Sequence, residues 1–205
     1  MYLRWILYVI FSNIINIICY ITNPIVILFC NEEGELPRFL NYWQTWDDSC
    51  DSEYYMHNCV PSFLDYGYDN KYTCVESTEF RLIQVGRKRL YSKLKPNATF
   101  STKEKVQRYF CRLLWLTRNC AYGFNFWIFG AYLNGITMNY KIKSDETTIG
   151  DNGKYFIIHS DASICQIWKF NIRWKLFLGW KIADQPGYTL NMLANRPLIT
   201  IEYIK

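Results

Sequence analysis

The first pattern along the chain is an uncharged apolar run at its N-terminus. Arg4 is the only charged residue of the first thirty, and an acidic cluster begins at Glu32. A positive start followed by an apolar run is typical of a signal sequence. The run is also long enough to cross a bilayer, which takes about 20 residues. The pattern predicts a signal peptide or an uncleaved signal anchor over 1–30, with 31–205 on the non-cytoplasmic side.

After residue 30 the polar and apolar positions predict strands, preceded by one short helix. Leu40, Trp43 and Trp46 fall at helical spacing behind Pro37, which favours a helix over 37–46. The following segments alternate, or are rich in β-branched and aromatic residues between turn residues. The expected strands are 53–57, 71–78, 80–85, 88–95, 107–116, 122–132, 136–143, 155–159, 164–170, 174–180 and 198–204.

Short strands spaced by about 8–12 residues are typical of a β-sandwich or barrel. Closing the sheet removes the exposed edges through which an aromatic-rich secreted chain would aggregate. We therefore expect one all-β domain over 31–205, an eight-stranded antiparallel up-and-down barrel with a short N-terminal helix. A barrel of this size holds one small ligand, and we expect it to be a monomer.

The cysteines indicate an oxidising compartment. An even number of cysteines after residue 30 predicts three disulfides whose pairing is open. Zinc binding is not expected, because the chain lacks a C-x₂-C pair and has two histidines. Asn97-Ala-Thr is an N-glycosylation sequon, which favours a surface loop. The cysteines expected to form bridges are Cys50, Cys59, Cys74, Cys111, Cys120 and Cys165.

Two blocks of the sequence resemble the tick salivary lipocalins, the histamine-binding family. YYMHNCVPSFLDYGYDNKYTCV at 54–75 is similar to that family's first barrel strand and the loop after it. YFIIHSDASICQIWKF at 155–170 is similar to a later strand, a Ser-Asp turn and the Cys-led strand that follows. The family's two C-terminal cysteines, which bridge to the equivalents of Cys74 and Cys165, have no counterpart here.

The resemblance implies a ligand-binding set inside the barrel. Asp65 and Tyr68 fall on the family's Asp-x-x-Trp ligand pair, and Glu104 lies in a similar short acidic motif. Trp174 and Lys175 stand where the family has an aromatic residue followed by glutamate, so Lys175 reverses the charge and favours an anionic lipid over an amine such as histamine. The alternatives are a turn for Asp65 and core packing for the aromatic residues.

The function expected from these observations is sequestration of an amine or a lipid by a secreted protein of a blood-feeding arthropod. No enzyme is expected, because His57 and His159 form no triad, and no motif requires a cofactor. The segment 81–118 holds eleven Lys and Arg against Glu104. It favours, as an alternative, a module with a filled barrel that binds a protein or a polyanion, with nucleic acid excluded by secretion. A membrane-anchored ectodomain is a third possibility.

Overall fold

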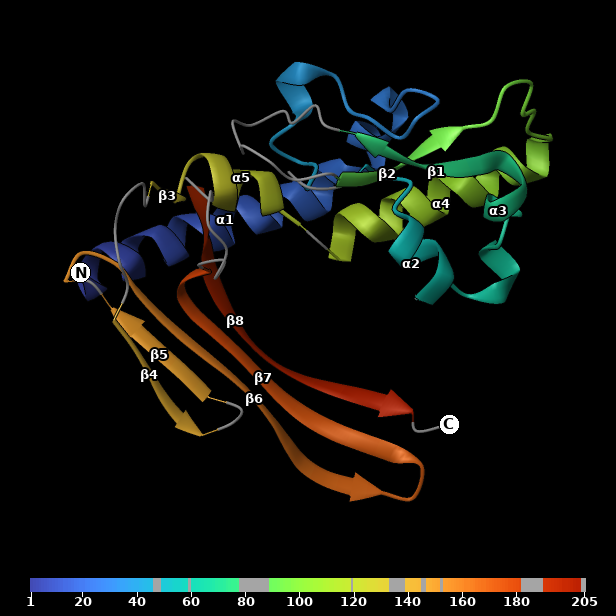
Figure 1. Ribbon diagram of the computed structural model, residues 1–205. Coiled ribbons are helices and arrows are strands. Elements are labelled where there is room, and N and C mark those ends of the chain that lie inside the picture. Colours follow the sequence, from blue (N-terminus) through green and yellow to red (C-terminus); the bar gives the residue numbers. More distant parts are fainter. Residues whose placement is uncertain are drawn as a thin grey trace. The chain divides into compact units, whose positions relative to one another are not determined.

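The computed structural model describes residues 1–45, 49–58, 60–77, 89–118, 120–132, 139–144, 147–151, 153–181 and 190–203 (Figure 1). The chain forms two compact units, each described separately below. The sheet unit consists of Met1–Phe11 and Asn125–Lys205, and the helical unit consists of Ser12–Phe124.

The N-terminal apolar run is one long helix that belongs to both units. Helix α1 runs over Tyr2–Val26, and a 3-10 helix continues it over Ile27–Phe29. Its length and hydropathy would suffice for a membrane span, and little of it is buried inside the protein. Its first turns pack in the sheet unit and its remainder in the helical unit.

The helical unit combines short helices, one long helix and a two-stranded ribbon. The ribbon pairs β1 (Tyr72–Ser77) antiparallel with β2 (Arg89–Leu94). The expected helix over 37–46 is reduced to a 3-10 turn over Arg38–Leu40, and a second 3-10 turn covers Ser62–Leu64. The α-helices are α2 (Glu53–Asn58), α3 (Tyr68–Lys71), α4 (Thr102–Arg118) and the start of α5 (Tyr122–Trp127).

Helix α4 replaces a predicted barrel strand, and its N-terminus shows why. Ser101 and Glu104 form a reciprocal capping box, in which each side chain accepts a hydrogen bond from the other residue's backbone N–H, at 2.7 Å and 3.3 Å. The buried positions on α4 then follow the helical period, not the period of two expected for a strand. They are Arg108, Cys111, Arg112, Trp115 and Leu116.

The sheet unit contains a six-stranded antiparallel sheet. Its strands lie in the order β3-β8-β7-β6-β5-β4, so β3 and β4 are its two edges. The long strands β6, β7 and β8 lie side by side and share the same curvature in Figure 1. The bounds are β3 (Ala131–Tyr132), β4 (Asn139–Ser144), β5 (Thr147–Asp151), β6 (Phe156–Ile167), β7 (Phe170–Lys181) and β8 (Leu190–Tyr203).

The all-β eight-stranded barrel is therefore wrong. The described strands form an open sheet and a separate ribbon, and no closed barrel is present among them. Two of the expected strands, 107–116 and most of 122–132, are helical, as is 53–57. Because the helical parts of these segments do not join a sheet, they supply no strands to close a barrel.

Several other expected strands lie where the structure has strands, although their first and last residues differ. The segments 71–78 and 88–95 contain β1 and β2, and 198–204 contains the end of β8. The expected Ser-Asp turn after His159 does not exist, because Asp161 pairs across the sheet with β7 and β6 continues to Ile167. The expected strand over 80–85 lies outside the described residues.

The core of the sheet unit surrounds Trp180, which is fully buried at the end of β7. Its indole N–H donates to the backbone oxygen of Phe129 at 2.9 Å. Gly179 beside it has a φ of +92°, and a Cβ there would lie 2.0 Å from the backbone oxygen of Phe156. Only glycine tolerates this approach of two backbones.

Candidate functional site

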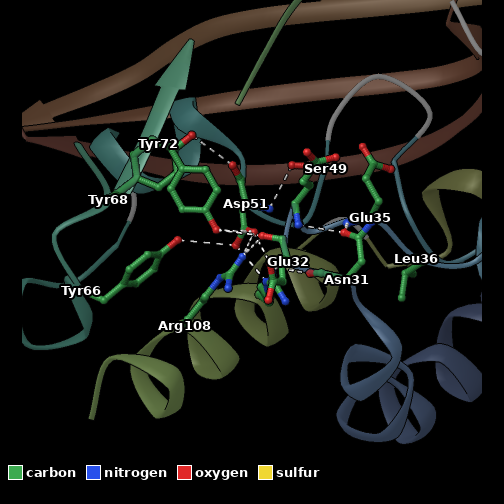
Figure 2. A network of polar contacts seen from close by, with 12 residues as sticks. Asn31, Glu32, Glu35, Leu36, Ser49, Asp51, Tyr66, Tyr68, Tyr72 and Arg108 are labelled. Atoms are coloured by element: carbon green, nitrogen blue, oxygen red, sulfur yellow. Dashed lines mark hydrogen bonds and ion pairs between the residues drawn. The ribbon is translucent and has the colours of Figure 1, made fainter. Parts of the chain in front are cut away.

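The buried carboxylate of Asp51 joins segments of the helical unit that lie far apart in the sequence. Asp51 lies on the loop before α2, and its side chain is 1% exposed. It accepts hydrogen bonds from Arg108 at 3.0 Å and from Arg112 through two nitrogens at 2.9 Å and 2.5 Å. The two arginines lie one turn apart on α4, so they point in the same direction. Figure 2 shows this network, which we call the polar core.

Tyrosines complete the shell around Asp51. Tyr72 on β1 donates to one carboxylate oxygen at 2.9 Å, and Tyr66 donates to the other at 3.5 Å. Tyr68 donates to the backbone oxygen of Asp51 at 3.3 Å and stacks on Tyr72. Every acceptor position of the buried carboxylate is therefore used.

The electrostatics of the polar core keep Asp51 ionised. Burial acts to raise the pKa of Asp51, but the charges and hydrogen bonds of Arg112 and Arg108 outweigh it and lower that pKa. Burial, followed by the charge of Asp51, raises the pKa of Tyr72 and of Tyr66. The pKa values of Asp51, Tyr66 and Tyr72 therefore all shift away from neutral pH.

The polar core also holds the segment that follows α1. Arg108 donates to the backbone oxygen of Glu32, and Arg112 donates to that of Asn31 at 2.9 Å. The Asn31 side chain in turn accepts from the backbone N–H groups of Glu33 and Glu35. The chain leaving the apolar helix is thereby fixed to α4 and Asp51 through backbone contacts.

Helix α1 presents its polar side chains inward and its apolar side chains outward. Every exposed side chain on α1 except Asn13 is Tyr, Leu, Ile, Phe or Pro. The buried positions include Ser12, Cys19 and Asn23, with Val26. This is the reverse of a water-soluble amphipathic helix, whose apolar stripe faces the core. We call the outward side the apolar face; its members include Leu3, Ile6, Leu7, Ile10, Phe11, Ile14, Ile17, Ile18, Ile21 and Ile25.

The inward side of α1 makes specific polar contacts in each unit. In the sheet unit, Arg4 donates to the backbone oxygen of Lys154 at 2.9 Å and stacks on the rings of Tyr155 and Trp180. Trp5 donates to the backbone oxygen of Ala194 at 3.0 Å.

In the helical unit, the inward side of α1 accepts hydrogen bonds from the rest of the fold. Trp43 donates to the Thr22 hydroxyl and Tyr109 to the backbone oxygen of Pro24, both at 3.0 Å. The Thr22 hydroxyl and the Pro24 carbonyl thus dock α1 in the helical unit.

Within the helical unit, Asp65, Tyr68 and Glu104 of the ligand set implied by the resemblance each have a separate structural role. Asp65 is exposed, and its side chain accepts a hydrogen bond from the backbone N–H of Gly67 at 2.8 Å. This contact agrees with the alternative in which Asp65 stabilises a turn. Tyr68 is part of the polar core, and Glu104 caps α4 and pairs with Lys71 at 3.2 Å. Hydrogen bonds from Ser101, then Lys71, lower the pKa of Glu104.

Trp174 and Lys175 belong to the sheet unit, whereas Asp65, Tyr68 and Glu104 belong to the helical unit. Lys175 lies opposite Asp161 on β6 and forms an ion pair with it at 3.6 Å. Arg173 binds the same carboxylate at 3.0 Å. The reversed charge at Lys175 is therefore compensated by a cross-strand partner.

No two of the cysteines whose side chains the structure describes lie at disulfide-bonding distance, so the predicted disulfides are not formed among them. Cys111 lies in the tyrosine cluster, where burial and then Asp51 raise its pKa to about 12. Cys165 is exposed on β6. Cys59 and the side chain of Cys74 lie outside the described residues.

The remaining surface predictions have mixed outcomes. Asn97 is exposed in a turn with a φ of +64°, as expected for a sequon on the surface, and its glycosylation stays a prediction. In the basic segment 81–118, Arg108 and Arg112 are buried in the polar core, and 81–88 lie outside the described residues. Among the described residues, no group of three or more His, Cys, Asp or Glu is placed to hold a metal ion.

Sequence reasoning missed the polar core and the apolar face. The sequence signal for the polar core was the pair Arg108 and Arg112, which are four residues apart on the helix that begins at the Ser101–Glu104 capping box. The signal for the second was the spacing of Ser12, Asn16, Cys19 and Asn23, which recur every three or four residues. Such recurrence marks one side of a helix.

Comparison with known proteins places the chain in a family. No curated protein and no solved structure matches it. A family of unknown function, DUF7338, matches residues 1–200, a range that includes α1, the polar core and most of β8. Since the match covers nearly the whole chain, the protein belongs to the DUF7338 family.

Proposed function

We propose that the protein is a non-enzymatic membrane-surface protein that keeps α1 and binds the lipid bilayer through the apolar face. The observation that carries this proposal is the orientation of α1, whose polar residues pack inward while nearly every outward side chain is apolar. Soluble monomers rarely expose an apolar patch larger than about 300–600 Å². A 25-residue helix is about 37 Å long at 1.5 Å per residue, so the apolar face is long and continuous.

The geometry favours a helix lying in the bilayer surface over one crossing it. A helix that crosses the bilayer alone contacts lipid on all sides, whereas α1 packs against protein in each unit, through Trp5 in the sheet unit and through Thr22 and Pro24 in the helical unit. The inward side also carries Arg4, Asn16 and Asn23, which are unfavourable in hydrocarbon. A helix with one lipid-facing side and one protein-facing side is typical of monotopic membrane proteins.

Retention of α1 is favoured over its removal as a signal peptide. Cleavage near residue 30 would leave Trp43 and Tyr109 without their hydrogen-bond acceptors on Thr22 and Pro24. It would also expose the residues of the helical unit on which Val26 and Ile27 pack. Secretion of the region 31–205 remains a separate prediction of the sequence.

We expect α1 to bind lipid through hydrophobic contacts and not through charge, because the apolar face carries no charged residue. This separates the proposal from polyanion binding by the segment 81–118, which salt would weaken. Sequestration of an amine or lipid also stays a prediction, now without the barrel that motivated it.

The test is flotation of the full-length protein with phosphatidylcholine vesicles at low and high salt, with the intact mass measured on the floated protein. The expected result is flotation at both salt concentrations by a chain that retains α1. Protein that stays at the bottom of the gradient, or floated protein whose sequence starts near residue 31, would contradict the proposal. Flotation that requires anionic lipid and disappears in high salt would favour the basic segment instead.

A further inference from the structure

Two pairs of cysteine thiols meet in the helical unit, and each pair joins the region 1–30 to the rest of that unit. In the first pair, Cys19 on α1 and Cys120 before α5 lie in the same buried cluster, with Ala121 between α4 and α5. The Cys120 thiol donates to the backbone oxygen of Asn16 at 3.4 Å and accepts from the side chain of Asn23 at 3.8 Å. Asn16 and Asn23 flank Cys19 by one turn on each side.

In the second pair, Cys30 directly follows α1 and its 3-10 extension, and Cys50 precedes Asp51. Both belong to the cluster formed around Val26, Trp115 and Leu116. The backbone N–H of Cys50 donates to the oxygen of Gly34 at 2.8 Å, which holds the two segments together. In each pair one thiol acts on the other: Cys120 raises the pKa of Cys19, and Cys30 raises the pKa of Cys50.

We propose that Cys30–Cys50 and Cys19–Cys120 are disulfide-forming sites, and that oxidation locks α1 covalently to the helical unit. Each pair has one member on or directly after α1 and its partner in the segment 31–124. The two bridges would close one short and one long loop of the chain, and a cross-link that closes a longer loop restricts the unfolded chain more. This inference does not depend on lipid binding.

The reaction requires an external two-electron oxidant, which we specify as a small disulfide such as oxidised glutathione. The thiolate of one cysteine attacks the oxidant, forms a mixed disulfide and releases one glutathione thiol. The second cysteine loses its proton to water, attacks the first sulfur and releases the second glutathione. The two protein thiols are thereby oxidised to a disulfide while the oxidant is reduced to two thiols.

The structure sets the order in which the two bridges form. Cys50, Cys19 and Cys120 are all buried, whereas Cys30 is partly exposed. The hydrogen bond with Cys30, followed by burial, also raises the pKa of the Cys50 thiol well above its usual range. Attack on the oxidant therefore begins at Cys30, and Cys30–Cys50 forms before Cys19–Cys120.

The test treats the reduced full-length protein with oxidised glutathione, blocks the remaining thiols by alkylation at timed intervals, and maps the bridges by mass spectrometry without reduction. The expected products are Cys30–Cys50 first and Cys19–Cys120 later. Exposed Cys165 serves as the internal control, because it should acquire glutathione and no partner cysteine. Stable glutathione adducts on Cys30 and Cys50, other pairings, or thiols that stay reduced after Cys165 has reacted would overturn the proposal.

A second readout tests the covalent lock itself. Glu33 is exposed in the turn after α1, where limited digestion with a glutamate-specific protease should cut. In the oxidised protein the fragment that contains α1 should stay attached on a denaturing gel until a reductant is added. The Cys30→Ser variant should lose the first bridge and keep the second. Release of the fragment from the oxidised wild-type protein without reductant would refute the lock, whatever the result with vesicles.

Discussion

The apolar face gives the sharpest quantitative prediction, which replaces three isoleucines with glutamine. Ile14, Ile17 and Ile21 lie on the outward side of α1 and are 49%, 61% and 72% exposed. Glutamine is a good helix former, so the helix itself should be retained. The three substitutions remove side chains that contact lipid in the proposed state and that contact little protein.

The expected loss follows from the exposed apolar surface. Full burial of an isoleucine side chain contributes about 1.5–3 kcal/mol, and each of these three has roughly half to three quarters of its surface available to lipid. The triple variant should therefore lose about 3 kcal/mol of partition free energy, or about a hundredfold in the vesicle partition coefficient. Titration of vesicles into protein, with the bound fraction measured by centrifugation, gives that coefficient.

A matched control exists in the sheet unit. Ile164, Ile167 and Ile199 are 53%, 59% and 61% exposed on β6 and β8, so their replacement by glutamine removes similar apolar surface. This control variant should bind vesicles like the wild-type protein. An equal loss in both variants, or less than a threefold change in the α1 variant, would refute the assignment of lipid binding to the apolar face.

Three further predictions concern stability, each measured by urea denaturation. Replacing Asp51 with Asn leaves two buried guanidinium groups without their counter-charge and should cost about 3–5 kcal/mol, while the same change at exposed Asp65 should cost far less. Because the folded state lowers the pKa of Asp51 below the ordinary value of 3.8, its contribution is complete above that pH and is lost as the pH falls through the folded-state pKa. The Asn variant should lack this component of the acid transition, and an unchanged acid transition would contradict the assigned ionisation. Replacing Ser101 with Ala removes half of the capping box on α4 and should cost about 1 kcal/mol, and a neutral result would mean that the cap does not stabilise α4. Replacing Gly179 with Ala forces a Cβ against the Phe156 backbone and should cost about 3 kcal/mol or more. At Gly153, which also has a positive φ but open space around it, the same change should cost about 1–2 kcal/mol. Equal losses at the two glycines would refute the steric account.

Local signals in the sequence identified several elements correctly. The apolar run predicts the α1 helix, and alternation and residue type predict β1, β2 and parts of β4, β6, β7 and β8, because these signals act over a few neighbouring positions. Strand β5 (Thr147–Asp151) was not predicted. The Ser101-x-x-Glu104 capping box also marked the start of α4 in the sequence, but we interpreted its glutamate as a ligand of a barrel. The apolar and aromatic residues of 107–116 predicted a strand in a segment that forms a helix.

The candidate site was far less predictable, because its parts come from distant positions. Asp51, Tyr72 and Arg108 meet only when the loop before α2, strand β1 and helix α4 are folded together. The cysteines show the same limitation. An even count after residue 30 suggested bridges among those six, whereas two described thiols of that set lie beside Cys19 and Cys30, which had been assigned to the signal segment.

The amino-acid order alone therefore indicated the apolar helix and several of the strands, because these depend on periodicity and residue type within a few positions. Which side of each helix faces inward depended on folding. On both α1 and α4 the inward side is partly polar, and such a side is stable only where distant groups supply hydrogen bonds and charges, as Asp51 does for Arg108 and Arg112. That complementarity is a property of three-dimensional contacts, and no local pattern of hydrophobic and polar residues encodes it.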